Sequence, residues 1–120
     1  MKTAQEKIEK FDEARGWKGD WHLKDLALNI TEEVGELWNL IKWVDEEKQR
    51  EIIKEHKEKA SDFIGDTLFL ILKMANKMGI DAEESLNNTL EEYEKRMPAD
   101  KMKESKHANK LSGGVDDKDD

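Results

Sequence analysis

The chain has 120 residues, of which 29 are acidic and 21 basic, so its formal charge is −8 at neutral pH. This length predicts one domain, and the acidic balance argues against a nucleic-acid surface, which needs a basic stripe. No cysteine is present, which excludes disulfides and thiolate metal sites. The N-terminus lacks an apolar signal segment, and no run approaches the roughly 18 apolar residues of a membrane span. We therefore expect a cytoplasmic protein with no membrane partner.

Four helical segments are predicted along the chain. One proline and seven glycines supply little turn chemistry, which disfavours a many-stranded fold. The first helix is expected at 3–14, and the two glycines of "RGWKGDW" end it. The second is expected at 23–44, where apolar residues recur at helical spacing. The charged stretch 45–60 is helix-prone and is interpreted either as a solvated extension or as a mobile flap.

The third helix is expected to end at Gly79, and the "DAEE" that follows is typical of a capping box, with Asp81 as N-cap. The fourth helix then continues to Arg96, and Pro98 discourages further helix. Residues 1–100 are therefore predicted to form one all-α bundle of four helices. The polar, acidic segment 101–120 is predicted to be a disordered tail.

Acidic side chains on the second helix point in different directions. With about 100° per residue, Glu33 lies only about 40° from the centre of the apolar stripe at Leu37. Glu36 lies at the edge of that stripe, and Glu32 points further out. A glutamate inside the core-facing arc is hard to explain as an ordinary solvated charge.

The third helix carries an acid within an almost wholly apolar run, 63–72. An ionised group taken out of water must pair, shift its pKa or bind a metal. Asp62 and Asp66 form an i, i+4 pair on a narrow polar stripe, which Lys73 continues. The opposite face of this helix is broadly apolar. That width predicts an oligomer, most simply a homodimer, because a small four-helix monomer does not readily cover it.

If the second and third helices pack antiparallel, Glu33 and Glu36 face Asp66 and Asp62. Converging carboxylates repel one another unless cations lie among them. Oxygen ligands favour Mg²⁺, with Mn²⁺ as an alternative, over zinc, and no histidine stands where a di-iron bundle would need one. The competing interpretation is a charged helix surface with structural ion pairs.

Two segments, "TEEVGELWNLIKW" and "IGDTLFLILKMANKMGIDAEESL", resemble the MazG family of all-α nucleoside triphosphate pyrophosphohydrolases, and the resemblance covers roughly residues 5–100. The family's Glu-Glu-x-x-Glu run is complete here as Glu32, Glu33 and Glu36. Its Glu-x-x-Asp run keeps Asp66 but has Phe63 in the glutamate position. The segments "FDEARGW", "LKDLALNITEEVGEL" and "EYEKRMP" are similar to the dCTP-pyrophosphatase-like branch.

The resemblance implies a bundle that assembles as a homodimer or a homotetramer. It also implies Mg²⁺-dependent cleavage of a nucleoside triphosphate between its α and β phosphates, to a monophosphate and pyrophosphate. It implies metal ligation by Glu33, Glu36 and Asp66, with Asp62 replacing the missing glutamate. Family members also place an Asn and a basic residue near the end of the fourth helix. Lys95 and Arg96 match the basic residue, while the Asn is displaced or absent.

Further roles follow from position. Glu32 is expected to act as general base, because it adjoins the ligands but leans away from them. Lys73 is expected to meet an outer phosphate as a point charge. In the glycine-bearing loop, Trp21 is the candidate for stacking on the base, and His22 for contacting base or phosphate. The alternative is a non-catalytic helical module that binds nucleotide or a protein partner, which Phe63 favours.

Overall fold

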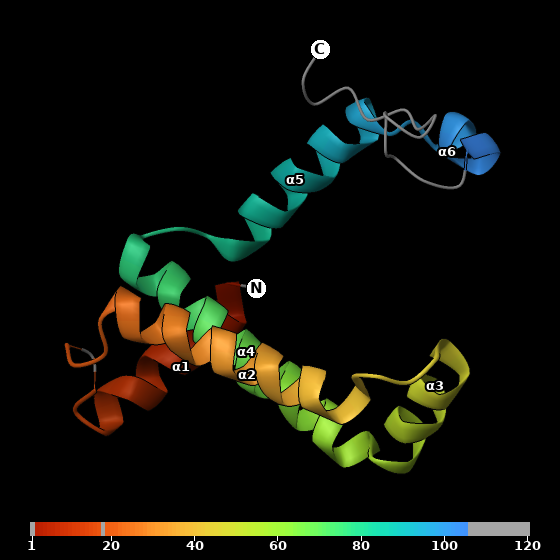
Figure 1. The fold of residues 1–120 in the computed structure, drawn as a ribbon. Helices are drawn as coiled ribbons and strands as arrows, with labels where there is room; N and C mark the ends of the chain where they lie inside the picture. The colour runs from red at the N-terminus through yellow and green to blue at the C-terminus, as the bar shows by residue number, and fades with distance from the viewer. Residues whose placement is uncertain (1, 18, 106–120) are drawn as a thin grey trace. The chain divides into compact units, whose positions relative to one another are not determined.

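The computed structural model describes residues 2–17 and 19–105 of the chain. These residues form six α-helices and no strand, as the all-α prediction requires. The chain divides into two compact units, Met1–Asp81 and Ala82–Asp120. Figure 1 shows the helices of both units, and each unit is described by itself.

The first unit is built on two long antiparallel helices. They are α2 (Leu23–Ile41) and α4 (Lys57–Met78), which run side by side in opposite directions (Figure 1). The helix α1 (Lys2–Ala14) packs along α4, and the short helix α3 (Glu46–Glu55) contacts both α2 and α4. The buried apolar side chains come from the two long helices: Leu26, Leu70, Leu72 and Ala75.

Polar contacts also hold α1 against the C-terminal half of α4. Gln5 Nε2 donates to Asn76 Oδ1 at 3.1 Å and to the backbone oxygen of Ile80 at 2.9 Å. Asn76 Nδ2 donates in return to the backbone oxygen of Gln5 at 3.0 Å. Because buried amides need such partners, this exchange contributes to the packing of α1 on α4.

The helix α4 ends where the sequence predicted. Gly79 has a φ of 67°, a left-handed conformation that glycine adopts without steric penalty. The N–H of Ile80 donates to the oxygen of Ala75 at 2.9 Å, and that of Gly79 to the oxygen of Asn76 at 3.3 Å. These two bonds form a Schellman motif, which satisfies carbonyls that the helix end would leave without partners.

The predicted second helix is too long at its C-terminal end. α2 ends at Ile41 rather than at residue 44, because Lys42 is extended and Trp43 has a φ of 68°. Asp45 then starts α3 by accepting a hydrogen bond from the backbone N–H of Lys48 at 2.9 Å. The charged stretch after α2 is therefore a separate capped helix that contacts its neighbours.

The second unit contains α5 (Ala82–Arg96) and α6 (Ala99–Ser105). α5 has the predicted limits, directly after Asp81 and up to Arg96. The predicted tail needs correction, since residues 101–105 belong to α6. Pro98 precedes this helix, and proline is tolerated at a helix start because its missing N–H has no helical acceptor there. The remainder of the predicted tail, 106–120, lies outside the described residues.

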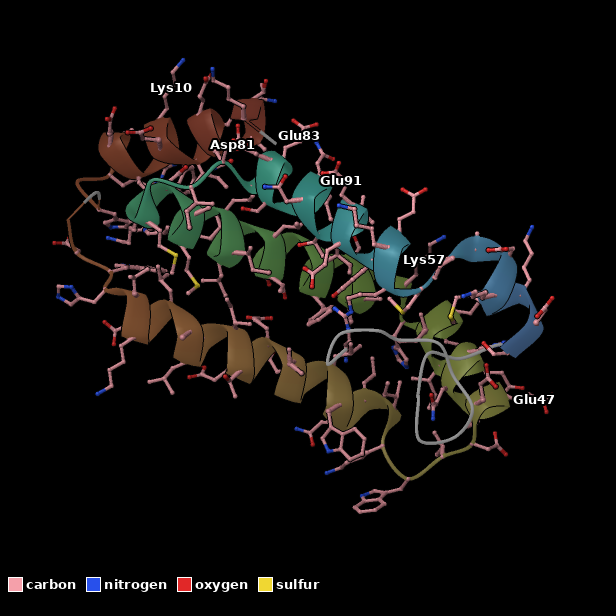
Figure 2. The ribbon with its side chains drawn as sticks, turned by 90° about the horizontal axis from the view of Figure 1, so that it is seen from above. Lys10, Glu47, Lys57, Asp81, Glu83 and Glu91 are labelled. Carbon is pink, nitrogen blue, oxygen red and sulfur yellow. The ribbon has the colours of Figure 1, made fainter. Side chains whose placement is uncertain are left out.

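Charged side chains cover the outer faces of the helices, as Lys10 on α1 and Glu47 on α3 illustrate (Figure 2). Across the described residues, every helix is either too short or too polar to cross a bilayer.

Candidate metal and nucleotide site

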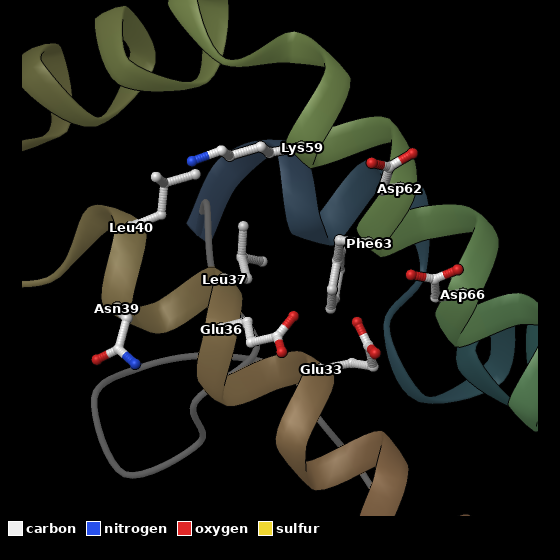
Figure 3. A pocket seen from close by; sticks show the side chains of 9 residues that line it. All are labelled: Glu33, Glu36, Leu37, Asn39, Leu40, Lys59, Asp62, Phe63 and Asp66. Carbon is white, nitrogen blue, oxygen red and sulfur yellow. The ribbon is translucent and has the colours of Figure 1, made fainter.

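A pocket of about 500 Å³ lies between α2 and α4. Four carboxylates line it, two from each helix, as Figure 3 shows. The sequence predicted that these four side chains share one site, and the structure brings them to one pocket. They are Glu33, Glu36, Asp62 and Asp66.

Helix geometry explains the arrangement. Glu33 is half-buried on the inward side of α2, and Glu36 follows on the exposed edge of the same face. Asp62 and Asp66 are exposed and stand one turn apart on α4. Since the two helices run antiparallel, each pair faces the other helix across the pocket (Figure 3).

The negative charge of the pocket affects the pKa of Glu33. Partial removal from water raises the pKa of Glu33 above its ordinary value of 4.5, and the negative charges of Glu36, Asp66 and Glu32 raise it further. Both causes disfavour the ionised form of the acid. A cation in the pocket would oppose both.

This shift predicts the pH dependence of Glu33→Gln in metal-free protein. The pKa of Glu33 is higher in the folded protein than in the unfolded chain, so protonated Glu33 favours the folded state. This contribution to the free energy of unfolding is complete below pH 4.5 and is lost as the pH rises through the folded pKa. The glutamine side chain of the variant cannot ionise and does not suffer that loss. The variant should therefore be more stable than the wild type at neutral pH, and equal to it at pH 4.

Urea unfolding in EDTA at the two pH values measures the difference. Glu91→Gln, which alters an exposed helical acid on α5, is the control. A stability difference for Glu33→Gln that is the same at both pH values would contradict the prediction.

The donor set suits a magnesium ion. Within the described residues, no three His, Cys, Asp or Glu side chains are grouped closely enough to hold a metal ion together. Mg²⁺ does not require such a cage, because it keeps several waters and binds through one or two carboxylates together with substrate phosphates. Oxygen donors on two facing helices, in a pocket where carboxylate charges repel, are the donors that such a site would use.

Five more residues line the pocket, and only Phe63 among them had a position in the site predicted from the sequence. Lys59 lies on the same polar stripe of α4 as Asp62 and Asp66, and among the described residues lining this pocket it alone carries positive charge. Asn39 adds an amide at the α2 end. The ring of Phe63 stands between the helices, beside Glu33 (Figure 3). Leu37 and Leu40 complete the wall.

Six predicted site residues lie outside this lining, and three of them lie on α2 or just before it. Glu32 is exposed on α2, next to Glu33. Trp21 is half-exposed in the segment before α2, and His22 is the exposed residue at the N-cap position of that helix. The side chain of His22 makes no capping hydrogen bond.

Lys73 lies elsewhere than the sequence predicted. Its side chain is only 2% exposed, and its Nζ is 3.1 Å from Oδ2 of Asp12 on α1. Asp12 is itself buried. The ammonium is therefore held at the interface of α1 and α4, where it cannot reach a phosphate in the carboxylate pocket without leaving Asp12.

Comparison with known proteins shows that the segment containing the pocket matches a family model. A family model for the MazG nucleotide pyrophosphohydrolase domain matches residues 22–100, which include every residue that lines the pocket. The chain belongs to the MazG family. Its fold is also similar to the crystal structure of a pyrophosphatase from Archaeoglobus fulgidus DSM 4304. The TM-score is 0.74 at 25% identity, over 82% of this chain and 92% of that one. No curated protein matches the chain.

The last two predicted site residues are Lys95 and Arg96, which were expected from the family resemblance. Lys95 and Arg96 occupy the last turn of α5, in the second unit. Arg96 Nη1 lies 3.3 Å from Glu92 Oε1 and its guanidinium is 5.3 Å from the ring centroid of Tyr93. Both residues fall within the matched range, but the structure describes their unit separately from the pocket.

Proposed function

We propose that this chain is a Mg²⁺-dependent nucleoside triphosphate pyrophosphohydrolase, which converts a (d)NTP and water to a (d)NMP and pyrophosphate. One observation carries the proposal: two pairs of carboxylates on facing helices share a pocket within the segment that matches the MazG family. An oxygen-lined pocket with repelling acids suits a cation and a phosphate chain better than an apolar ligand.

In this proposal the magnesium ion binds among Glu33, Glu36 and Asp66, directly through one or two of these carboxylates and through water to the others. Asp62 supports them. Mn²⁺ has the same preference for oxygen ligands and should substitute for it. When bound, the metal neutralises phosphate charge and makes a water easier to deprotonate. The protein supplies the ligand positions, and Leu37 adds an apolar side chain to the lining.

The reacting water attacks the α-phosphorus, and the bond from that phosphorus to the α–β bridging oxygen breaks. Glu32, exposed beside the ligands, orients this water and takes its proton. The leaving pyrophosphate carries the bridging oxygen and its electron pair. Lys59 lines the pocket and is suited to contact the phosphate chain as a point charge. The sequence had predicted this contact for Lys73.

Contacts to the rest of the nucleotide are proposed from position and from the family resemblance. Trp21 is proposed to stack on the base, because it is half-exposed and aromatic faces accept any base. His22 is proposed to contact the base or a phosphate. Lys95 and Arg96 are proposed as phosphate contacts on the family resemblance.

The decisive experiment incubates the purified chain with a panel of (d)NTPs and Mg²⁺ while pyrophosphate and monophosphate are measured. Equal release of the two products, abolished by EDTA, would support the proposal. The second candidate function is a non-catalytic module, which Phe63 favours because it removes a carboxylate from the family's ligand run. Binding of nucleotide without release of either product would establish that second function.

The pair Asp62 and Phe63 gives a testable account of the departure from the family pattern. Asp62 has a short side chain, which reaches a magnesium ion through water more readily than directly. We expect Asp62→Ala to raise the Mg²⁺ concentration needed for half-maximal activity by about 10-fold, and Phe63→Glu to lower it. Asp81→Ala, an acid outside the pocket, is the control. An unchanged Mg²⁺ titration in Asp62→Ala would assign that residue to the surface.

The proposal includes a homodimer or homotetramer. Three large aliphatic residues on one face of α4 are exposed to 55%, 43% and 45%: Ile64, Leu68 and Ile71. A continuous apolar face of this kind is typical of an interaction surface. A second copy is the simplest partner, because closed homo-oligomers bury such faces by symmetry.

We predict that the protein sediments as an oligomer at micromolar concentration, at a mass at least twice the 14.0 kDa of one chain. Leu68→Lys places a charge in the apolar face of α4 and should shift the population towards monomer. Leu28→Lys, at a leucine of α2 that is also exposed, should leave the assembly unchanged. A monodisperse wild-type monomer would contradict the prediction.

A further inference from the structure

A buried ion pair outside the carboxylate pocket has no role in the reaction described above. Lys73 is 2% exposed and Asp12 is 6% exposed, with 3.1 Å between Nζ and Oδ2. The pair is electrostatic rather than a well-directed hydrogen bond, because the ammonium has no acceptor in hydrogen-bond geometry among the described residues. Oδ1 of Asp12 likewise has no hydrogen-bond partner there.

Aromatic rings enclose the ammonium on its other sides. Nζ lies 4.3 Å from the ring centroid of Trp21 and 5.8 Å from those of Trp17 and Phe69. The two indoles are stacked, with centroids 5.5 Å apart and planes at 24°. Phe11 packs edge-on against both Trp17 and Phe69 at 5.9 Å. The cation thus joins three segments: α1, the segment before α2, and α4.

Stability alone does not explain this pair. Burying two charges is costly, and replacing a buried ion pair by apolar residues of similar volume is often neutral or stabilising. Here the cost is increased by two polar atoms without directed partners. Apolar residues would not orient the neighbouring indoles, whereas a cation does. It attracts the face of an indole when it lies within about 6 Å of the ring centroid.

We propose that Lys73 and Asp12 are a positioning pair that orients the stacked indoles of Trp17 and Trp21 as the surface on which the nucleotide base rests. Asp12 holds the ammonium at one place, and the ammonium fixes the plane of Trp21. Trp17 then stacks on Trp21. Both indoles are half-buried rather than fully buried, so part of the stack is open to a ligand.

The placement along α4 fits this role, which rests on the proposed pyrophosphohydrolase function. Asp66 and Lys73 are seven residues apart on the same helix, a rise of about 10 Å. That is the scale of a triphosphate chain extended towards its nucleoside. With the phosphates at the carboxylate pocket, a base held near Lys73 would contact the indoles. Lys73 and Asp12 would then determine the affinity for the base and not the rate of the chemical step.

The test uses a double variant, Asp12→Leu with Lys73→Met, because either change alone leaves an unpaired buried charge and risks misfolding. Near-ultraviolet circular dichroism reports the stacked indoles, and Trp21→Phe defines how much of that signal they contribute. Steady-state kinetics with the best NTP of the panel separates KM from kcat. Binding of a non-hydrolysable α,β-methylene analogue of that NTP is measured separately.

We expect the double variant to keep its far-ultraviolet spectrum and to lose the indole signal. Its KM and its dissociation constant for the analogue should rise about 10-fold, since base stacking contributes about 1–3 kcal/mol, while kcat changes less than about threefold. The control Gln5→Leu with Asn76→Leu removes a separate polar contact between α1 and α4 and should change neither the KM nor the dissociation constant.

Two results would overturn the proposal. The first is a double variant with the wild-type indole signal, which would show that the pair does not orient the stack. The second is a lost indole signal with unchanged KM and analogue binding, which would show that the stack does not carry the base. If the wild type releases no pyrophosphate, the proposed reaction fails, and analogue binding together with the indole signal still decides whether the pair positions a nucleotide-binding surface.

Discussion

Glu33→Gln, Glu36→Gln and Asp66→Asn are each expected to reduce Mg²⁺-dependent pyrophosphate release by at least about 100-fold. Even residues that only support metal ligands lower activity by about 10- to 100-fold when they are replaced, so loss of a ligand should exceed that range. An amide keeps the shape of each side chain but carries no negative charge for the cation. The measurement is pyrophosphate release at saturating Mg²⁺ for each variant.

The same variants should remain folded. Each change removes one charge from a repelling group, so the metal-free protein should be at least as stable as the wild type. Far-ultraviolet circular dichroism and thermal unfolding in EDTA measure this, with Glu91→Gln as the matched control for both assays. Near-wild-type turnover in any two of the three variants would remove the metal-site proposal.

Leu26→Ala should destabilise the first unit by about 3 kcal/mol or more. Leu26 is fully buried on α2, in a core that contains few other buried apolar side chains. Replacing a buried leucine loses its transfer free energy and leaves a cavity that neighbouring side chains only partly fill. Because the apolar residues of this unit are largely exposed in the single chain, little other burial is available to offset the loss.

Urea unfolding at a fixed protein concentration measures the effect, since association would otherwise alter the apparent stability. Leu28→Ala is the matched control: it removes the same atoms two residues further along α2, where the leucine is 56% exposed. That variant should change the free energy of unfolding by less than about 1 kcal/mol. If both variants lost the same free energy of unfolding, burial in the single chain would not determine how much each leucine contributes to stability.

The helix limits were largely predictable because their signals are local. Gly79 provides the left-handed residue that ends α4, and the hydrophobic period on α2 indicates its inward face. The end of α2 was not predictable, because it depends on the positive φ of Trp43, a conformation unusual for a bulky residue. α6 was missed because proline after a helix is normally a stop signal, although proline also begins helices.

The candidate site was predicted in part for a related reason. The period of 3.6 residues places Glu33 inward and aligns Asp62 with Asp66, so the acids of the pocket follow from two local patterns and one packing assumption. Lys59 lies on the same stripe, seven residues before Asp66, but periodicity cannot distinguish a lysine beside a pocket from one beside solvent. Its place became evident only once α2 packed opposite it.

By itself, the sequence determined the helical class, the main helix limits and the acids that turn inward, since these depend on contacts between residues a few positions apart. Only the tertiary structure decided the partner of Lys73. Its stripe position suggested a phosphate, yet Asp12 lies on another helix, some sixty residues away along the chain, and the two meet only because α1 packs on α4. A charge excluded from water pairs with the nearest opposite charge in space, and nearness in space is a property of the packed fold.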